Sequence, residues 1–344
     1  MGRSEAIVAE RLTAQGLCGE PARDPVTVAE RLLAVQAQDP RGARLAIRTR
    51  STGLTATDVD RALDERALLI TWLNRGTLHL VRGEDYPWLH ALTTPPLLNS
   101  NTRRLRQEGI GEGDAERGVE TIERSLADEG PLIRGELRDR LDSAGVRTQG
   151  QALVHLLFLA TLRGTAVRGP MRGTEHAYVL TRDWLGPQEQ VDREQALAEL
   201  ARRYLVGHGP ADDRDLARWA GLPLRDARAG LAAIASELRR REDGLVDLAK
   251  RPPAEPLPPP RLLGPFDPLL LGWVSREDIV GEHRTLVTTN GIFRPFALVG
   301  GRAVATWKLA GGKIRIEPLE RVSKKDAAAL GADAEEVLAF VTPR

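Results

Sequence analysis

A recurring order of predicted secondary structure constrains this chain more than any single residue does. Helical periodicity dominates residues 1–240. Within that stretch, groups of helices followed by a short hairpin or its remnant occur three times. Three helices and a hairpin is the order of the winged helix, a variant of the helix-turn-helix. The copies share little residue identity, so they repeat an architecture rather than a sequence.

The first copy is predicted to occupy residues 1–110. Thr27 is a possible N-cap for its second helix. Asp39-Pro40 is expected to end that helix, because a residue before proline avoids the α region. The predicted helices are 7–15, 26–36, 43–50 and 58–65, and the predicted strands are 68–72 and 77–82, around a turn at 74–76.

The second copy is expected at residues 111–190 and the third at 191–250. Either Asp212 or Asp213 can cap the middle helix of the third copy. Arg239–Arg241 would close its last helix, where the helix dipole favours cations. The predicted helices are 115–128, 133–142, 149–163, 194–206, 213–220 and 224–241; the predicted strands are 165–168 and 176–180, around a loop at 169–174, with a reduced wing at 244–248.

The character of the sequence changes after residue 250. Six prolines between 251 and 262 predict a stiff linker. Beyond it, Gly-rich turns separate short strand candidates at 285–289, 294–299, 302–309 and 313–319. This spacing predicts a small antiparallel sheet or barrel at residues 263–344, with a last helix at 326–339.

Composition excludes several classes of protein. The 49 Lys and Arg against 48 Asp and Glu give a net charge of +1, which excludes a uniformly basic coat but allows a local basic surface. The single cysteine, Cys18, excludes an intramolecular disulfide framework. The six histidines lack metal-ligand spacing, so neither a metal nor a cofactor is expected. With no apolar run long enough to span a membrane and no signal-peptide pattern, the expected location is cytoplasmic.

The segment Gln36-Ala37-Gln38-Asp39-Pro40 stands out in a chain without a P-loop, GxSxG or HExxH motif. Taken alone, it is better explained as a helix end with two solvated amides. His155, inside an apolar helix, reads better as a core histidine with a satisfied hydrogen bond than as a ligand.

Three segments together resemble the AlkZ/YcaQ family of bacterial DNA glycosylases, which have the HTH_42-type fold. These segments are Leu-Leu-Ala-Val-Gln36-Ala-Gln38-Asp-Pro, Thr71-Trp-Leu-Asn-Arg75-Gly-Thr77-Leu-His79 and Leu263-Gly-Pro-Phe-Asp267-Pro-Leu-Leu-Leu-Gly-Trp273. The resemblance implies a mainly α fold with β structure: three tandem winged-helix domains followed by a small C-terminal antiparallel β-barrel. It also implies excision of N7-alkylated purines, including unhooking of interstrand crosslinks, in DNA repair or antibiotic self-resistance.

In that family, Gln-apolar-Gln marks the AlkZ-like branch and Gln-apolar-Asp the YcaQ-like branch. Gln36-Ala37-Gln38 matches the first at every position, so the resemblance implies that Gln36 and Gln38 are catalytic. A glutamine carbonyl can accept a hydrogen bond from water while its NH₂ donates to a sugar or phosphate oxygen. Such an amide orients a water without deprotonating it.

Other residues have candidate roles too, and the expected partner is double-stranded DNA with alkylation damage. Asp39 could add charge stabilisation or simply form the turn with Pro40. Asp267 reads as a structural anchor, paired to an arginine. The candidate DNA contacts are Arg41, Arg44, Arg48, Arg75, Thr77, His79, Arg168 and Arg172.

Two other classes of function remain open at this point. A winged-helix regulator normally dimerises to read paired half-sites, whereas three modules in one chain without a heptad zipper favour a monomeric enzyme. A barrel that binds a small molecule has only the Gly-rich C-terminal strands in its favour. A Schiff-base lyase is not expected, because all five lysines lie at or beyond position 250.

Overall fold

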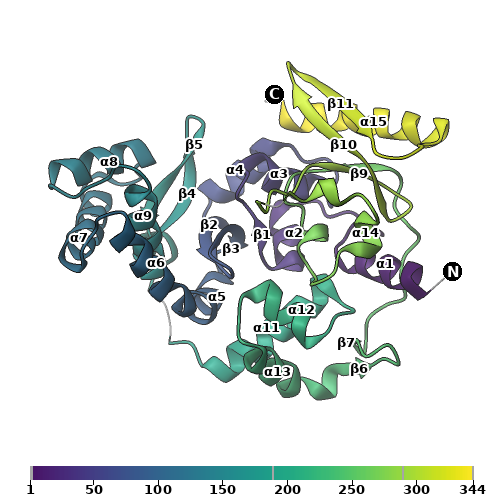
Figure 1. The fold of residues 1–344 in the computed structure, drawn as a ribbon, viewed down its shortest axis with the longest axis horizontal. Helices are drawn as coiled ribbons and strands as arrows, with labels where there is room; N and C mark the ends of the chain where they lie inside the picture. Colours follow the sequence, from purple (N-terminus) through teal and green to yellow (C-terminus); the bar gives the residue numbers. More distant parts are fainter. Residues whose placement is uncertain (1–2, 188–189, 289, 343–344) are drawn as a thin grey trace. The chain divides into compact units, whose positions relative to one another are not determined.

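The chain forms two compact units, one of them built from two separate stretches of sequence. The computed structural model describes residues 3–187, 190–288 and 290–342. Unit 1 comprises Met1–Val59 and Leu197–Arg344, and unit 2 comprises Asp60–Ala196. Unit 2 is therefore inserted between the two halves of unit 1 in the sequence (Figure 1).

Unit 1 holds the N-terminal helices and everything after residue 197. Its N-terminal part contains α1 (Arg3–Ala14), α2 (Pro25–Leu32), β1 (Val35–Gln36), α3 (Pro40–Arg48) and the start of α4 (Ala56–Asp64). Its later part contains most of α11 (Arg193–His208), then α12 (Asp213–Ala220), α13 (Leu224–Ala233), η1 (Ala235–Glu237), β6 (Leu238–Arg240), β7 (Val246–Leu248), β8 (Arg261–Leu263), η2 (Pro268–Leu270), α14 (Glu277–Val280), η3 (Arg284–Leu286), β9 (Phe296–Val299), β10 (Arg302–Ala310), β11 (Lys313–Pro318) and α15 (Lys324–Val341).

Unit 2 combines two hairpins with a group of helices. Its elements are β2 (Leu68–Leu73), β3 (Thr77–Arg82), α5 (Tyr86–Thr93), α6 (Pro95–Gln107), α7 (Glu112–Glu129), α8 (Arg134–Ser143), α9 (Ala152–Leu162), β4 (Ala166–Arg172), β5 (Glu175–Leu180) and α10 (Thr181–Leu185). The strands of this unit pair antiparallel in the order β3-β2-β4-β5. The predicted hairpins are confirmed, including the turn at 74–76.

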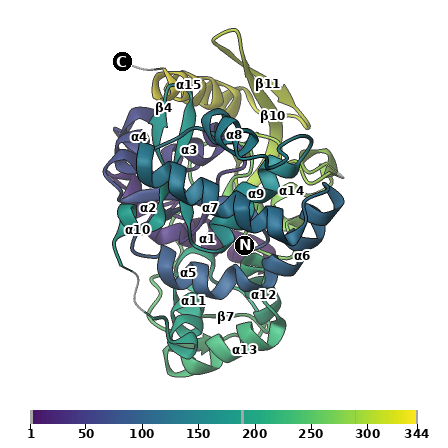
Figure 2. The same ribbon diagram turned by 90° about the vertical axis from the view of Figure 1, so that its left-hand side faces the viewer.

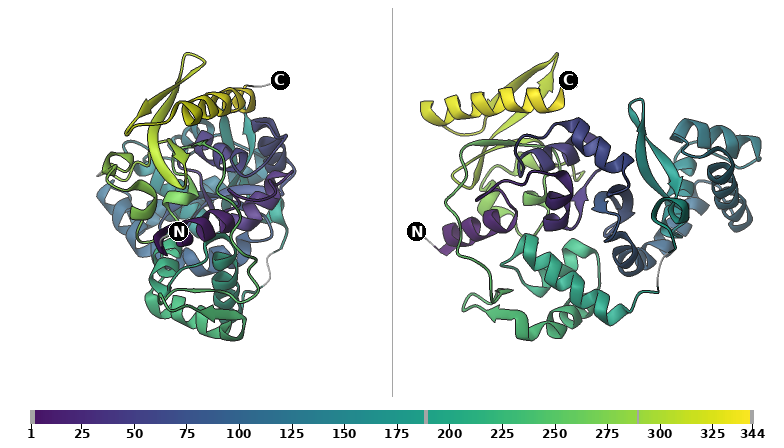
Figure 3. Two further views of the ribbon diagram at one scale, coloured as in Figure 1. Left: turned by 90° about the vertical axis from the view of Figure 1, so that its right-hand side faces the viewer. Right: turned by 180° about the vertical axis from the view of Figure 1, so that it is seen from behind.

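The predicted C-terminal barrel is wrong. Among the described residues, β11-β10-β9-β8 form an open antiparallel sheet and no closed barrel is found. Closure requires the two edge strands to pair, and one expected strand is missing, because residues 284–286 form the 3₁₀ helix η3 instead. The helix α15 packs on this sheet and contacts both β8 and β11 (Figure 3).

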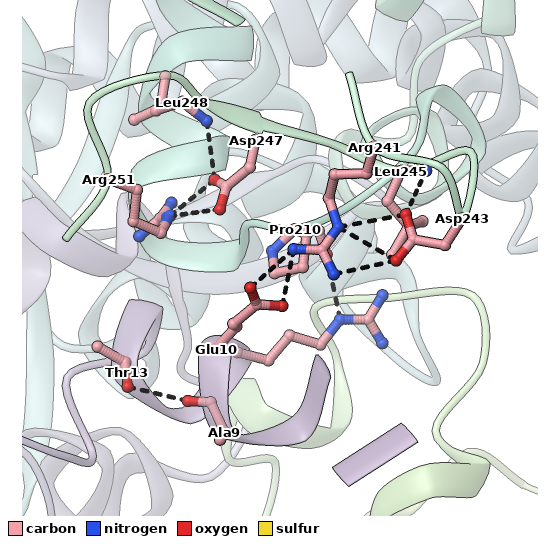
Figure 4. A network of polar contacts seen from close by, with 11 residues as sticks. Ala9, Glu10, Thr13, Pro210, Arg241, Asp243, Leu245, Asp247, Leu248 and Arg251 are labelled. Atoms are coloured by element: carbon pink, nitrogen blue, oxygen red, sulfur yellow. Dashed lines mark hydrogen bonds and ion pairs between the residues drawn. The ribbon is translucent and has the colours of Figure 1, made fainter. Parts of the chain in front are cut away.

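The helix predicted over 224–241 is shorter than expected. α13 ends at Ala233, and Arg239–Arg240 lie in strand β6, which pairs with β7. Arg241 therefore cannot serve a helix C-terminus. Its guanidinium instead contacts Glu10 of α1 at 2.7 Å and Asp243 in the β6–β7 turn at 3.0 Å (Figure 4).

A second ion pair in the same region holds the start of the proline-rich linker. Arg251 contacts Asp247 at 2.7 Å (Figure 4). The Asp247 carboxylate also accepts from the backbone N–H of Leu248. Together with the Glu10–Arg241 contact, this pair fixes the β6–β7 hairpin on the body of unit 1.

No described helix combines the length and apolar character needed to span a lipid bilayer.

Candidate active site

The glutamine motif lies on a connection between a short strand and a helix, not at a helix end. The predicted helix 26–36 begins instead at Pro25, with Asp24 rather than Thr27 as N-cap, and ends at Leu32. Leu33 then takes a positive φ of 64°, which a continuing right-handed helix cannot adopt. The chain re-enters extended structure in β1, which places Gln36 on a strand.

The two glutamines differ in exposure. Gln36 is 6% exposed, and its amide has no hydrogen-bond partner among the described residues. Gln38, two residues later, is exposed. One amide is thus held almost buried and the other projects outward from the same short connection.

Asp39 begins the next helix. Its carboxylate accepts hydrogen bonds from the backbone N–H groups of Arg41 at 2.9 Å and Gly42 at 3.0 Å. Pro40 occupies the first helical position, where its missing N–H has no consequence. Asp39-Pro40 therefore starts α3 rather than ending α2, and N-capping accounts for the Asp39 carboxylate.

The helix α3 packs closely on the segment that follows β8. A Cβ atom added to Gly42 would lie 2.4 Å from the carbonyl oxygen of Pro265, and one added to Gly264 would lie 2.8 Å from Cβ of Leu45. Neither position tolerates a side chain without a backbone shift. The first turn of α3, directly after the glutamine motif, is thereby held against the Gly264–Asp267 segment.

A buried ion pair fixes the other end of α3. The Arg50 guanidinium donates to both carboxylate oxygens of Asp267, at 3.0 and 2.8 Å, with the two side chains 1% and 0% exposed. It also donates to the Gln15 carbonyl and side-chain oxygens, at 2.8 and 2.9 Å, and to the Ala46 carbonyl. Asp267 is thus an anchor paired to an arginine, as predicted.

The three arginines of α3 that were predicted as DNA contacts have different surroundings. Arg48 binds Asp333 and Glu336 of α15, at 2.7 and 2.9 Å. Arg44 is 9% exposed and donates to the Pro40 carbonyl. The Arg41 side chain is 69% exposed and lies 4.0 Å from Asp39. A structural role accounts for Arg48, and Arg41 has the outward position that a phosphate contact requires.

In unit 2, the β2–β3 hairpin places two predicted site residues, Thr77 and His79, on one face. Thr71 pairs with His79 and Leu73 with Thr77, and residues opposite or two apart in a strand share a face. The oxygens of Thr71 and Thr77 and the amide of Asn74 are buried and have no hydrogen-bond partner among the described residues. Buried polar groups without partners call for a functional explanation.

Burial keeps the His79 ring uncharged at neutral pH. Its Nδ1 lies 2.9 Å from the Thr77 carbonyl oxygen, so Nδ1 carries the proton and Nε2 keeps a lone pair. Burial and, secondly, the nearby Arg75 charge lower the pKa of His79 to about 3. The ring therefore keeps a neutral hydrogen-bond acceptor at Nε2.

The comparison with protein families decides the identity. A model described as DNA glycosylase AlkZ-like matches residues 29–340, a range that includes all three motif segments. The chain belongs to the AlkZ-like DNA glycosylase family. It is therefore an enzyme of the class that acts on N-glycosyl bonds of DNA, as the resemblance implied.

The sequence and the structure of this AlkZ-like chain are both similar to a DNA glycosylase from the same organism. A curated protein of Streptomyces sahachiroi, the "Interstrand DNA cross-link repair glycosylase", is 28% identical over 353 residues, covering 92% of this chain and 91% of the relative. The solved structure of Streptomyces sahachiroi DNA glycosylase AlkZ is 26% identical, with a TM-score of 0.79 and 98% coverage of both chains. The mixed helix and sheet fold thus matches that of AlkZ.

The two arginines predicted in the second wing of this AlkZ-like chain already have contacts inside unit 2. Arg168 is stacked between Trp72 and Tyr178, with its guanidinium carbon 4.7 and 5.0 Å from the ring centroids. Arg172 binds Glu136 at 2.6 Å and donates to the Pro131 carbonyl. His155 shares hydrogen bonds with Asn101 and is a structural histidine, as predicted.

Sequence reasoning missed a buried aromatic cluster that the AlkZ-like motif helps to build. Trp273 ends the third motif segment and donates from Nε1 to the His208 carbonyl at 2.9 Å. His208 stacks on Tyr204 with ring centroids 4.8 Å apart, beside Trp219 at 5.2 Å. Burial lowers the pKa of His208 to about 3. Only the position of His208 one helical turn after Tyr204 on α11 could have signalled this role.

The burial of His79 and His208 predicts that the folded protein loses stability in acid. An unfolded histidine binds a proton below pH 6.5, whereas the folded groups stay neutral down to about pH 3. The free energy of unfolding should therefore fall as the pH drops from 6.5 towards 3, by about 2 kcal/mol per histidine at pH 5. Urea unfolding at pH 7.5 and 5.0 measures this, and His208→Phe should show a smaller difference. Equal stability of the wild type at both pH values would contradict the prediction.

Proposed function

We propose that this chain hydrolyses the N-glycosidic bond of N7-alkylated guanine in double-stranded DNA, including bulky adducts and interstrand crosslinks. Family membership supports the reaction class, and the name of the Streptomyces relative supports crosslinked DNA as a substrate. The observation that carries the proposal is the Gln36-Ala37-Gln38 connection. It holds one nearly buried amide that has no hydrogen-bond partner among the described residues, and one exposed amide beside it. The biological role would be DNA repair or antibiotic self-resistance.

The chemistry suits a site with two amides. Alkylation at N7 gives guanine a positive charge and makes it a good leaving group, so the glycosidic bond needs little acid assistance. The remaining task is to hold a water near C1′ and stabilise an oxocarbenium-like sugar. Gln36 and Gln38 would orient that water through their carbonyl oxygens and donate from NH₂ to sugar or phosphate oxygens. Neither glutamine acts as a base.

The arrangement of DNA-binding modules is part of the proposal. Leu132, between α7 and α8, forms a bridge to Tyr178 of β5, and Ala211, between α11 and α12, forms one to Val246 of β7. A short strand between the first two helices that pairs with the wing is typical of winged helices. These bridges support the second and third winged-helix modules, at 111–190 and 191–250. The β2–β3 hairpin supports the first module, at 1–110.

Each unit would contribute its own contacts to DNA. On unit 1, Arg41 is the arginine of α3 with an outward side chain. On unit 2, the unpartnered oxygens of Thr71 and Thr77 and the neutral ring of His79 form a polar face that could receive a nucleotide. Arg75, in the turn of the β2–β3 hairpin, would contact phosphate.

Excision assays on defined duplexes test this function. The protein should release N7-methylguanine from double-stranded DNA, leaving abasic sites that alkali cleaves into fragments visible on a denaturing gel. Activity should survive EDTA, and borohydride should trap no covalent enzyme–DNA adduct, since neither a metal nor a lysine is proposed to take part. Tight DNA binding without any excision would instead identify a non-enzymatic winged-helix protein.

A further inference from the structure

The third helix of the module at 111–190 is not available to the DNA major groove. In a helix-turn-helix protein, the recognition helix must lie on the surface. Here α9 is almost entirely apolar, and Leu153, Leu156 and Leu157 are each 4% exposed or less. α6 packs along it (Figure 2).

Hydrogen bonds fix α6 on α9. The buried Asn101 of α6 donates to the His155 carbonyl at 3.1 Å and pairs with the His155 ring at 3.0 Å. Leu105, one turn later, is also buried. The outer face of α6 thereby replaces α9 as the surface on that side of unit 2.

Several arginines elsewhere on unit 2 are neutralised by carboxylates. Arg172 of the wing binds Glu136, and Arg163 at the end of α9 binds Glu116 at 2.5 Å. Ion pairs of this kind leave little net positive charge for a polyanion. The other pairs on α7, α8 and α10 are Arg117–Asp114, Arg138–Asp139, Arg140–Glu129 and Arg182–Glu123.

α6 is different, because no acidic residue occurs from Tyr86 through Gln107. The helices that pack on α6 are α5 and α9, and neither contains Asp or Glu. Arg103 and Arg106 are exposed and form no ion pair or side-chain hydrogen bond among the described residues. Glu108, just beyond the helix, accepts from the backbone N–H of Gln151 instead.

The spacing on α6 concentrates this charge. Residues three and four apart share a helix face, so Asn99, Thr102, Arg103 and Arg106 project together. All four are exposed. Two like charges at this spacing cost stability unless an anion lies between them. Asparagine and threonine side chains commonly accompany arginine in contacts to DNA phosphates.

We propose that the outer face of α6, centred on Arg103 and Arg106, is a binding surface for the phosphate backbone of double-stranded DNA. In the module at 111–190, this surface supplies the DNA contact that neither α9 nor the β4–β5 hairpin provides. The inference rests on the proposed DNA substrate, but it concerns binding and not excision. Because the contacts are to phosphates, the surface binds without regard to base sequence.

The salt dependence of DNA binding tests the surface. Arg103→Gln/Arg106→Gln should weaken binding to an undamaged duplex on the order of tenfold and reduce the slope of log K against log salt by about 1 to 2. Fluorescence anisotropy with a labelled duplex over a salt series gives both values. Arg103→Lys/Arg106→Lys, which keeps the charge, should retain most of the wild-type slope.

The matched control removes two arginines that already have carboxylate partners. Arg117→Gln/Arg138→Gln changes the net charge of unit 2 equally, and these side chains are 56% and 54% exposed. Its slope should stay at the wild-type value. An unchanged slope in the α6 variant with an intact circular dichroism spectrum, or an equal loss in the control, would overturn the proposal.

The outcome is separable from the proposed function. Binding to undamaged DNA requires no excision, so a wild type without glycosylase activity can still show the α6 effect. Conversely, the control variant Arg117→Gln/Arg138→Gln should excise N7-methylguanine at the wild-type single-turnover rate. Normal excision combined with an unchanged salt slope would remove the surface and leave the function.

Discussion

Gln36→Ala and Gln38→Ala should each slow the excision of N7-methylguanine by about 10²–10³, while DNA affinity stays within a few-fold of the wild type. The expected loss is that of one positioned hydrogen bond in a catalytic site. Gln36 should show the larger effect, because its amide is held almost buried on β1 and lacks another partner among the described residues. Single-turnover rates on one defined duplex measure both variants.

The control is Gln149→Ala, which removes an exposed glutamine from unit 2 and should excise at the wild-type rate. Gln38→Asp is a sharper variant. It places a carboxylate beside the cationic sugar and should retain more activity than Gln38→Ala. Wild-type rates in both alanine variants, with intact circular dichroism spectra, would show that neither glutamine takes part in excision.

Breaking the Arg50–Asp267 pair should have the largest effect on stability. Arg50→Met leaves a carboxylate that is 0% exposed without its counter-charge. Removing one partner of a buried ion pair costs about 3–5 kcal/mol. Urea unfolding monitored by circular dichroism should show this loss, with a lower midpoint for the variant than for the wild type.

The double variant Arg50→Met/Asp267→Leu separates charge from packing. Without a buried charge, its free energy of unfolding should exceed that of Arg50→Met. It should stay below the wild type, because the Gln15 and Ala46 acceptors lose their donor. A double variant less stable than the single one would show that shape, rather than charge pairing, dominates at this position.

The sequence predicted local elements well where periodicity and turn residues agree. The helices α7, α8, α9 and α12 and both hairpins of unit 2 lie within a few residues of their predicted bounds. The helix α6 was missed, because Pro95-Pro96 followed by a polar run is typical of a loop. Proline is tolerated in the first turn of a helix, and the packing of Asn101 and Leu105 on α9 supplies the rest of the stability.

The backbone conformation of the glutamine motif was predicted wrongly. The sequence predicts that Gln36 ends a helix, whereas it lies on strand β1. No residue near Leu33 predicts its positive φ, because leucine does not favour the left-handed region of backbone conformation. The close packing at the start of α3 involves Pro265, which lies more than 200 positions away from Gly42 in the sequence. Asp267 was recognisable as an anchor, whereas its partner Arg50 was indistinguishable from the many other arginines.

The 217-residue separation of Arg50 from Asp267 has a consequence for synthesis on the ribosome. Arg50 emerges long before its counter-charge has been translated, and all of unit 2 is made in the interval. Because domains generally fold as units during translation, unit 2 can acquire its structure while the N-terminal helices of unit 1 still await their C-terminal half. The glutamine motif would then reach its final geometry only after residues 264–267 have emerged. A nascent chain that ends before them carries both glutamines without the packing that positions α3.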